Sequence, residues 1–190
     1  HTQGMLEKET EFVTMAQLYL QAEVPYKAAT LLQEKMDAGV VAKSEKHYRL
    51  LSQAWMLSQE DEKAIPALQA AAALANDGEL DLRLANTYLN VGRYGDCVTS
   101  ANTALRKGGL KNVDNAQISL GMCLYNLRRY SDAKTAFSNA AKSPRSKRIS
   151  NQWVQVIDSE VERNRQIDLA EKAAQKKRRE LEAKRNAASV

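Results

Sequence analysis

Histidine, cysteine and serine are the residue types that most often carry catalysis or hold a metal, and this sequence uses them sparingly. His1 and His47 are its two histidines, and neither has a second ligand at the spacing of a metal site. No Ser, Cys or Asp stands in a recognisable nucleophile motif, and no Gly-rich phosphate-binding pattern is present. The sequence therefore predicts no catalytic residue, no metal site and no cofactor.

Cys97 and Cys123 are the remaining candidates for chemistry. Two cysteines are too few for a disulfide-stapled scaffold, and their spacing is not that of a zinc or redox motif. They can form a disulfide bond if the protein is exported, or they can both serve as small buried apolar side chains. Core filling is the expected role, and pairing is the alternative.

Basic residues gather near the C-terminus. The net charge of the 190-residue chain is +5, yet residues 142–190 alone carry 13 Lys plus Arg against 7 Asp plus Glu. The run Lys176-Lys177-Arg178-Arg179 could attract nucleic acid or an anionic surface. Because glutamates interrupt the cations in an Ala-rich frame, a solvated helix face is the expected role. Nucleic acid is the alternative partner.

The elements that must position these residues are helices. Only 8 Gly and 3 Pro occur in the chain, and Ala, Leu, Gln, Lys and Glu are abundant, as in helical proteins. No apolar run is long enough to span a membrane. The pattern predicts helices at 8–22, 25–37, 44–58, 61–75, 79–91, 94–107, 113–127 and 130–142, followed by one long helix from about 146.

Small residues recur along these helices at a nearly constant distance. The series Ala28, Ala64, Cys97, Ala133 has steps of 36, 33 and 36 residues. A second series runs through the preceding helices and consists of Ala16, Ser52, Ala85 and Gly121. Two helices whose small residues face each other can approach closely. The spacing resembles the tetratricopeptide repeat, a helix-turn-helix unit of about 34 residues.

This resemblance implies an all-α solenoid. Four repeat units are expected within residues 1–145, at 8–37, 44–75, 79–107 and 113–142. Residues 146–190 are expected to form a C-terminal capping helix with a charged extension. Its apolar stripe, which should cover the last repeat, consists of Ile149, Trp153, Val156, Ile157 and Val161.

The concave side of such a solenoid is lined by the first helix of each repeat. Residues three and four apart share a helix face, which places amide, apolar and one cationic side chain on this wall. The candidate groove residues are Arg49, Gln53, Met56, Leu82, Asn86, Asn90, Ile118, Met122, Tyr125 and Asn126. Gln53, Asn115 and Ser119 depart from the Lys, Asn and Arg clamp of chaperone-tail binders, so that activity is not implied.

The chain also resembles a narrower group, the tetratricopeptide proteins encoded beside TonB, ExbB and ExbD in some Gram-negative bacteria. The stretches that carry this likeness are Ala16 to Ala22, Pro25 to Ala29, Leu51 to Trp55, Lys63 to Pro66, Gly108 to Lys111, Leu120 to Met122 and Gln152-Trp153. The resemblance implies a periplasmic or envelope-associated protein, with a cytoplasmic location as the alternative. Within the chain, the stretch from Gly4 to Lys8 resembles that from Gly39 to Lys43, which implies that His1 to Gly4 is the tail of a preceding repeat, with Gly4 ending a helix.

The expected function is therefore that of a protein-protein interaction scaffold. It would bind a peptide segment or a helix of another protein in the groove, in support of TonB-dependent transport. The alternatives are binding of nucleic acid or an anionic surface through the basic C-terminal helix, and self-association through that helix.

Overall fold

The computed structural model describes the backbone of residues 2–188 and the side chains of residues 8–185. This part of the chain folds entirely into helices joined by short connections. The helices are α1 (Thr2–Gln21), α2 (Pro25–Asp37), α3 (Glu45–Leu57), α4 (Asp61–Leu74), α5 (Glu79–Asn90), α6 (Tyr94–Lys107), α7 (Val113–Asn126), α8 (Tyr130–Ala140) and α9 (Pro144–Ala188).

The helix bounds lie within a few residues of those expected from the sequence, except at the start. The expected beginning of α1 at residue 8 is wrong, because α1 already begins at Thr2. Gly4 does not end a helix, since it lies inside α1. The expectation that His1 to Gly4 closes a preceding repeat is corrected accordingly for residues 2–4. His1 lies outside the described residues.

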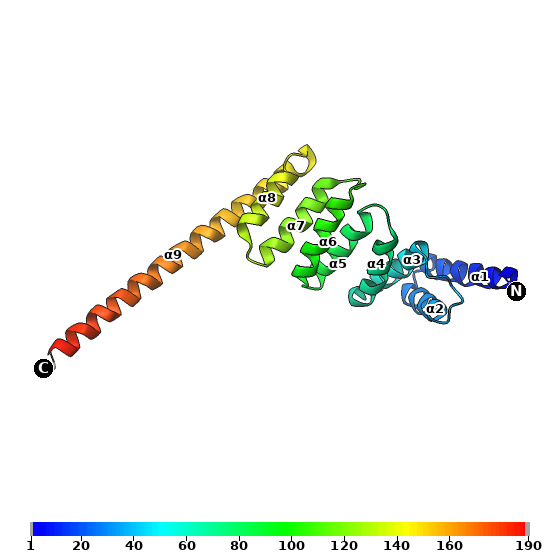
Figure 1. Cartoon of the computed structure of the whole chain (residues 1–190), viewed down its shortest axis with the longest axis horizontal. Helices are drawn as coiled ribbons and strands as arrows, with labels where there is room; N and C mark the ends of the chain where they lie inside the picture. The colour runs from blue at the N-terminus through cyan, green and yellow to red at the C-terminus, as the bar shows by residue number, and fades with distance from the viewer. Residues whose placement is uncertain (1, 189–190) are drawn as a thin grey trace.

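The helices pack as antiparallel pairs that stack along one direction (Figure 1). The pairs are α1 with α2, α3 with α4, α5 with α6, and α7 with α8. We call the members of each pair its first and second helix. Each intra-pair turn holds one residue at a positive φ, and these residues are Glu23, Gln59, Gly92 and Arg128. Their spacing repeats that of Ala28, Ala64, Cys97 and Ala133, so the backbone has the period of the sequence.

Close approach within a pair explains the small residues. Ala16, Ala28, Ala85 and Ala133 are all fully buried. At Gly121 an added Cβ would lie 2.9 Å from the ring of Phe137 on the partner helix. Because that distance is shorter than a real Cβ contact, only glycine allows α7 and α8 to pack at this separation. The short side chains therefore set the distance between the helices of a pair.

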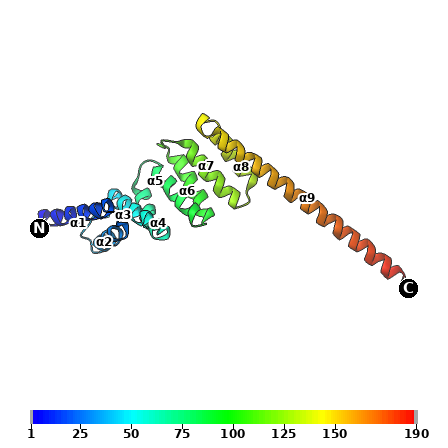
Figure 2. The same ribbon diagram turned by 180° about the vertical axis from the view of Figure 1, so that it is seen from behind.

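Helix α9 begins on the last pair and then leaves the array (Figures 1 and 2). Trp153 stacks on Phe137 with ring centroids 5.4 Å apart, and Ile157 is fully buried. The expected stripe is only partly confirmed, because Ile149, Val156 and Val161 are exposed. The cap uses a different face, to which Ser146 and Ser150 contribute.

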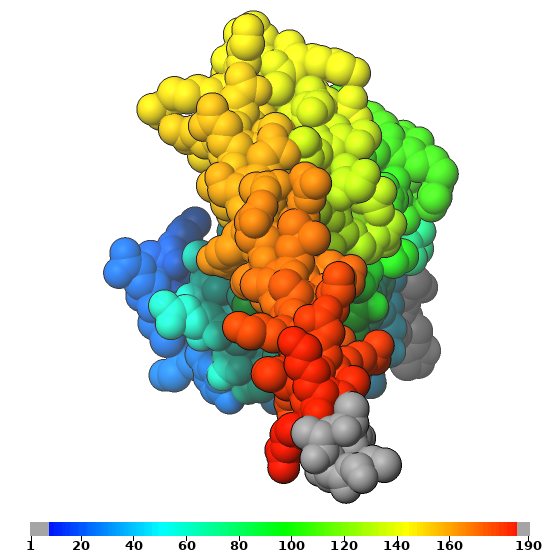
Figure 3. All heavy atoms as spheres, turned by 90° about the vertical axis from the view of Figure 1, so that its left-hand side faces the viewer, coloured from blue at the N-terminus to red at the C-terminus, as the bar shows by residue number. Residues whose placement is uncertain are grey.

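The C-terminal extension of α9 stands clear of the repeats. The two ends of the molecule lie far apart, and the view from the C-terminal end shows α9 in front of the helix pairs (Figure 3). The side chains of residues 161–185 are all exposed. In this structure the extension makes its polar contacts with itself, as in the 2.6 Å ion pair between Lys172 and Asp168.

Cys97 and Cys123 form a disulfide bond, with Cα atoms 6.1 Å apart. The expectation that they are unpaired core residues is therefore wrong in this structure. Cys97 lies on α6 and Cys123 on α7, and both are fully buried. The two helices belong to successive pairs, so the bond joins the third pair to the fourth. The two cysteines are therefore both paired with each other and part of the core.

Candidate functional site

The first helices line the inner side of the stack. α5 and α7 contact each other directly although they belong to different pairs, and α7 contacts α9 in the same way. Ser119 Oγ on α7 donates a hydrogen bond of 2.6 Å to Asn86 Oδ1 on α5. Because these first helices meet across pairs, their side of the stack is concave from α5 to α9. We call the surface of α5 and α7, together with the matching face of the first helix α3, the groove.

On α3 the structure leaves Arg49 and Gln53 exposed and Met56 half-buried. Arg49 Nη2 lies 2.6 Å from Glu45 Oε1 on the same helix, so its charge is already matched. Gln53 remains available as a hydrogen-bonding amide in this part of the groove.

On α5 one of the predicted groove residues is misplaced. Leu82 is only 8% exposed and packs against Ala104 and Ala116, so it is part of the interior and leaves the candidate set. Asn86 and Asn90 are exposed. Asn90 Nδ2 donates a hydrogen bond of 3.3 Å to Asp61 Oδ2 on α4. The two amides therefore supply the polar part of the groove.

On α7 the predicted residues give a more apolar surface. Ile118, Met122 and Tyr125 are half-buried, and Asn126 is exposed. The Tyr125 ring contacts Trp153 on α9 with centroids 5.4 Å apart. Asn126 Nδ2 donates to the backbone oxygen of Met122 at 2.8 Å. The sequence did not indicate this link between the groove and the C-terminal helix.

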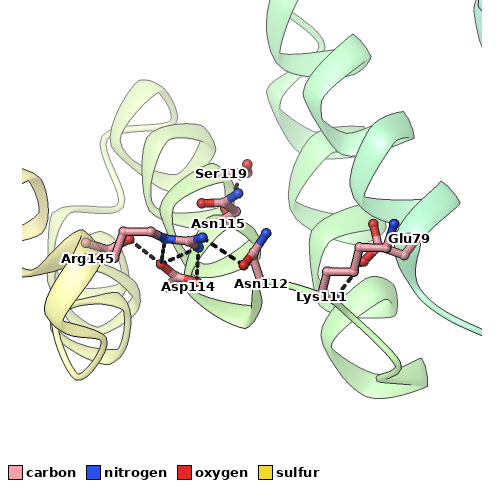
Figure 4. A network of polar contacts seen from close by, with 8 residues as sticks. Glu79, Lys111, Asn112, Asp114, Asn115, Ser119 and Arg145 are labelled. Carbon is pink, nitrogen blue, oxygen red and sulfur yellow. Dashed lines mark hydrogen bonds and ion pairs between the residues drawn. The ribbon is translucent and has the colours of Figure 1, made fainter.

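A polar network closes one end of the fourth pair (Figure 4). Asp114, which is 9% exposed, accepts hydrogen bonds from Ser146 Oγ and from the Arg145 guanidinium, the latter at 2.7 Å and 2.9 Å. These donors, Ser146 foremost and then Arg145, lower the pKa of Asp114 to about 2. Arg145 also donates to Asn112 Oδ1 at 2.8 Å. The network holds the start of α9 on α7.

A second network joins the second and third pairs. Lys107 Nζ, in the last turn of α6, donates to the backbone oxygens of Ala72 at 2.7 Å and Ala75 at 3.4 Å. The same ammonium lies 2.8 Å from Asp81 Oδ2, a nearly buried carboxylate on α5. Lys107 therefore satisfies carbonyl groups at the end of α4 and also forms an ion pair with a nearly buried carboxylate.

His47 contacts groups that join two helices. Its Nδ1 lies 2.8 Å from the backbone oxygen of Ala42 and 3.3 Å from Glu9 Oε1 on α1. It therefore sits at the contact of α1 with α3. Among residues 8–185 no three His, Cys, Asp or Glu side chains come together as a metal site. No helix in the described part of the chain is long and apolar enough to cross a membrane.

Solved structures resemble this arrangement of helix pairs. YrrB, described as a tetratricopeptide protein with an unusual peptide-binding site, matches with a TM-score of 0.67 and 14% identity over 85% of this chain and 83% of its own. The fold is that of tetratricopeptide-repeat proteins. The structure of MamA is also similar, with a TM-score of 0.60 and 20% identity over 72% of this chain and 78% of MamA.

A third similar structure is pilF of Pseudomonas aeruginosa, with a TM-score of 0.62 and 14% identity over 84% of this chain and 72% of that one. Neither a protein-family model nor a curated protein sequence matches the chain. At these identities the likeness concerns the tetratricopeptide fold alone. The site must be read from the residues that this chain places on its groove.

Proposed function

We propose that this protein is an interaction scaffold whose groove binds a peptide segment or a helix of another protein. The observation that carries the proposal is the row of exposed amides that neighbouring first helices present, Gln53 on α3 and Asn86 and Asn90 on α5. An amide side chain both donates and accepts, so it can bond the backbone of a bound segment in either direction. The peptide-binding site named for YrrB supports the same use of the fold.

We further propose that the scaffold works in the bacterial envelope, in support of a TonB-dependent uptake system. The likeness of the sequence to proteins encoded beside TonB components suggests this setting. The disulfide between Cys97 and Cys123 supports it, because such bonds persist in oxidising compartments. Fractionation of the source cells tests the location, and recovery of the protein in the cytoplasm alone would contradict it.

The groove is tested by a pull-down from an envelope extract with the chain immobilised. Asn86→Trp together with Asn90→Trp fills the groove with bulky rings and should abolish capture of the partner that the unchanged chain retains. Asn102→Trp is the matched control, because Asn102 is an exposed asparagine on the second helix α6. Equal capture by all three proteins would refute binding in the groove.

Truncation after Arg163 separates the groove from the basic extension. The groove proposal predicts that the shortened chain still captures its partner. Loss of capture would assign the interaction to the extension, and an affinity that then falls steeply with salt would indicate nucleic acid or another polyanion. A change of oligomeric state on truncation would instead indicate self-association.

A further inference from the structure

The cap helix α9 keeps the register of a first helix. On α5 and α7 the face that packs on the preceding pair follows residue steps of four, three and four. On α9 the residues buried or half-buried against α7 and α8 follow the same steps. The three sets are Leu80, Leu84, Thr87 and Val91, then Ala116, Leu120, Cys123 and Leu127, then Ser146, Ser150, Trp153 and Ile157. Val91 and Leu127 directly follow their helices, and Leu127 is exposed.

This register fixes which residues of α9 face the groove. Groove positions lie three, six, nine and ten residues after the first residue of each set. On α5 they are Arg83, Asn86, Leu89 and Asn90, and on α7 they are Ser119, Met122, Tyr125 and Asn126. On α9 the same offsets give Ile149, Gln152, Gln155 and Val156.

The face of α9 that would receive a second helix is different. In the earlier pairs this face carries small and aromatic residues such as Ala85 and Tyr88. On α9 the equivalent positions hold Asn151, which is exposed and polar, and Val154, which is half-buried. An asparagine at the position of Ala85 does not allow the close approach of a second helix that alanine allows. The stack of pairs therefore ends at α9.

The groove face of α9 nevertheless carries two apolar side chains that are not buried by packing within the chain. Ile149 is 42% exposed and Val156 is 47% exposed. A shallow surface hollow of α9 is lined by Val156 together with Gln152, Gln155, Ser159, Glu160 and Arg163. By register Ile149 and Val156 continue the apolar part of the groove formed by Ile118, Met122 and Tyr125. Exposed apolar side chains next to such a surface mark an interaction site.

The unmatched charges at or beside these positions are positive. Arg83 lies at a groove position of α5, and Arg148 takes the place on α9 that the groove residue Ile118 has on α7. Neither guanidinium has a hydrogen-bond or ion-pair partner among the residues whose side chains the structure describes. Glu79, one turn before Arg83, accepts from the backbone N–H of Lys111 at 2.6 Å, and Glu160, one turn after Val156, pairs with Arg163 at 2.5 Å. A ligand with carboxylates would match this surface.

We infer that α9 is a fifth wall of the groove, and that the groove takes a peptide segment in which apolar residues are flanked by Asp or Glu. This inference rests on the proposed function, because it extends the same groove. The apolar side chains of the segment contact Ile149 and Val156 beside the α7 surface. Its carboxylates pair with Arg83 and Arg148.

The probe is a library of random 12-residue peptides displayed on phage and selected on the full chain. Selected peptides should combine apolar residues with Asp or Glu, and their synthetic forms should bind the chain in fluorescence anisotropy. Ile149→Ser with Val156→Ser should weaken binding about tenfold or more, as expected when apolar contacts at the centre of an interface are removed. Arg148→Glu should weaken binding of the acidic peptides and leave a peptide with Asp and Glu changed to Asn and Gln less affected.

Val161→Ser and Lys147→Glu are the matched controls, because both residues are exposed on α9 outside the groove face. If the paired Trp variant at Asn86 and Asn90 abolishes binding while the α9 variants do not, the groove stands and the fifth wall is wrong. If neither set changes binding, or no peptide is selected, both proposals fail. Selection of basic peptides, or a dimer that depends on Ile149 and Val156, would overturn the stated ligand.

Discussion

Replacing Asp114 with asparagine tests whether its polar network holds α9 on the repeats. The pKa of this carboxyl is lowered to about 2 from an ordinary value of 3.8 by hydrogen bonds from Ser146 and Arg145. One pKa unit corresponds to about 1.4 kcal/mol, so the charged form contributes about 2 kcal/mol to the free energy of unfolding. Asp114→Asn should remove about this amount at pH 7, since the amide carries no charge for Arg145.

The pH dependence gives the sharper test. Because the pKa of Asp114 is lower in the folded chain, its contribution is fully present above about pH 4 and is lost as the pH falls toward 2. Urea unfolding followed by circular dichroism should therefore show the two proteins differing at pH 7 and converging near pH 2. The effect should survive moderate salt, since the carboxylate is nearly buried.

Asp132→Asn is the control for this experiment. Asp132 pairs with Arg129 at 2.6 Å, but both side chains are about half exposed. Such surface pairs contribute roughly 0 to 1 kcal/mol. If Asp114→Asn costs no more than this control, or if its cost is the same at pH 7 and near pH 2, the assigned role of Asp114 is refuted.

Three further variants probe the packing. Gly121→Ala should cost about 1 to 3 kcal/mol in urea unfolding, because its Cβ would meet the Phe137 ring at 2.9 Å, whereas Gly95→Ala, with no atom within 4 Å, should cost nothing. Cys97→Ala with Cys123→Ala should lose about 3 kcal/mol, as expected for a bond between residues 26 apart; two free thiols in the unreduced, denatured wild type would contradict this pairing. Lys107→Met should cost about 3 to 5 kcal/mol by leaving Asp81 buried and unpaired. Adding Asp81→Asn should restore part of that loss, and an unchanged stability of both variants would show that the network is inert.

The sequence predicted the helix pairs because the residues that determine them are local. Small residues from Ala28 to Ala133 recur at the repeat period, and small side chains at that spacing indicate helices that pack closely in pairs. Leu82 was placed wrongly because its burial depends on Ala104 and Ala116, which belong to other helices. The period alone cannot show such a contact.

The sequence did not predict the groove face of α9, for a related reason. From Gly121 to its counterpart Asn151 the step is 30 residues, shorter than the earlier steps, because α8 ends at Ala140 and α9 begins at Pro144. Ile149 and Val156 were therefore assigned to the capping stripe rather than to the groove face. Likewise, pairing of Cys97 with Cys123 depends on how closely α6 approaches α7, which no local pattern encodes.

The covalent and ionic links are unevenly distributed along the stack, so the free energy of local unfolding should differ from one helix pair to the next. The disulfide and the networks of Lys107 and Asp114 join successive units from α4 to α9. The first pair is joined to the second by Glu9, which lies 3.3 Å from His47 Nδ1 and accepts from the backbone N–H of Ala42 at 3.1 Å. Helix α1 leaves Met15 and Leu18 exposed where later first helices are covered. In a chain of units that contact only their neighbours, fraying starts at the least supported end. Among the helix pairs, amide exchange should therefore be fastest in α1 and α2, and the groove should open more readily at that end than at the end beside α9.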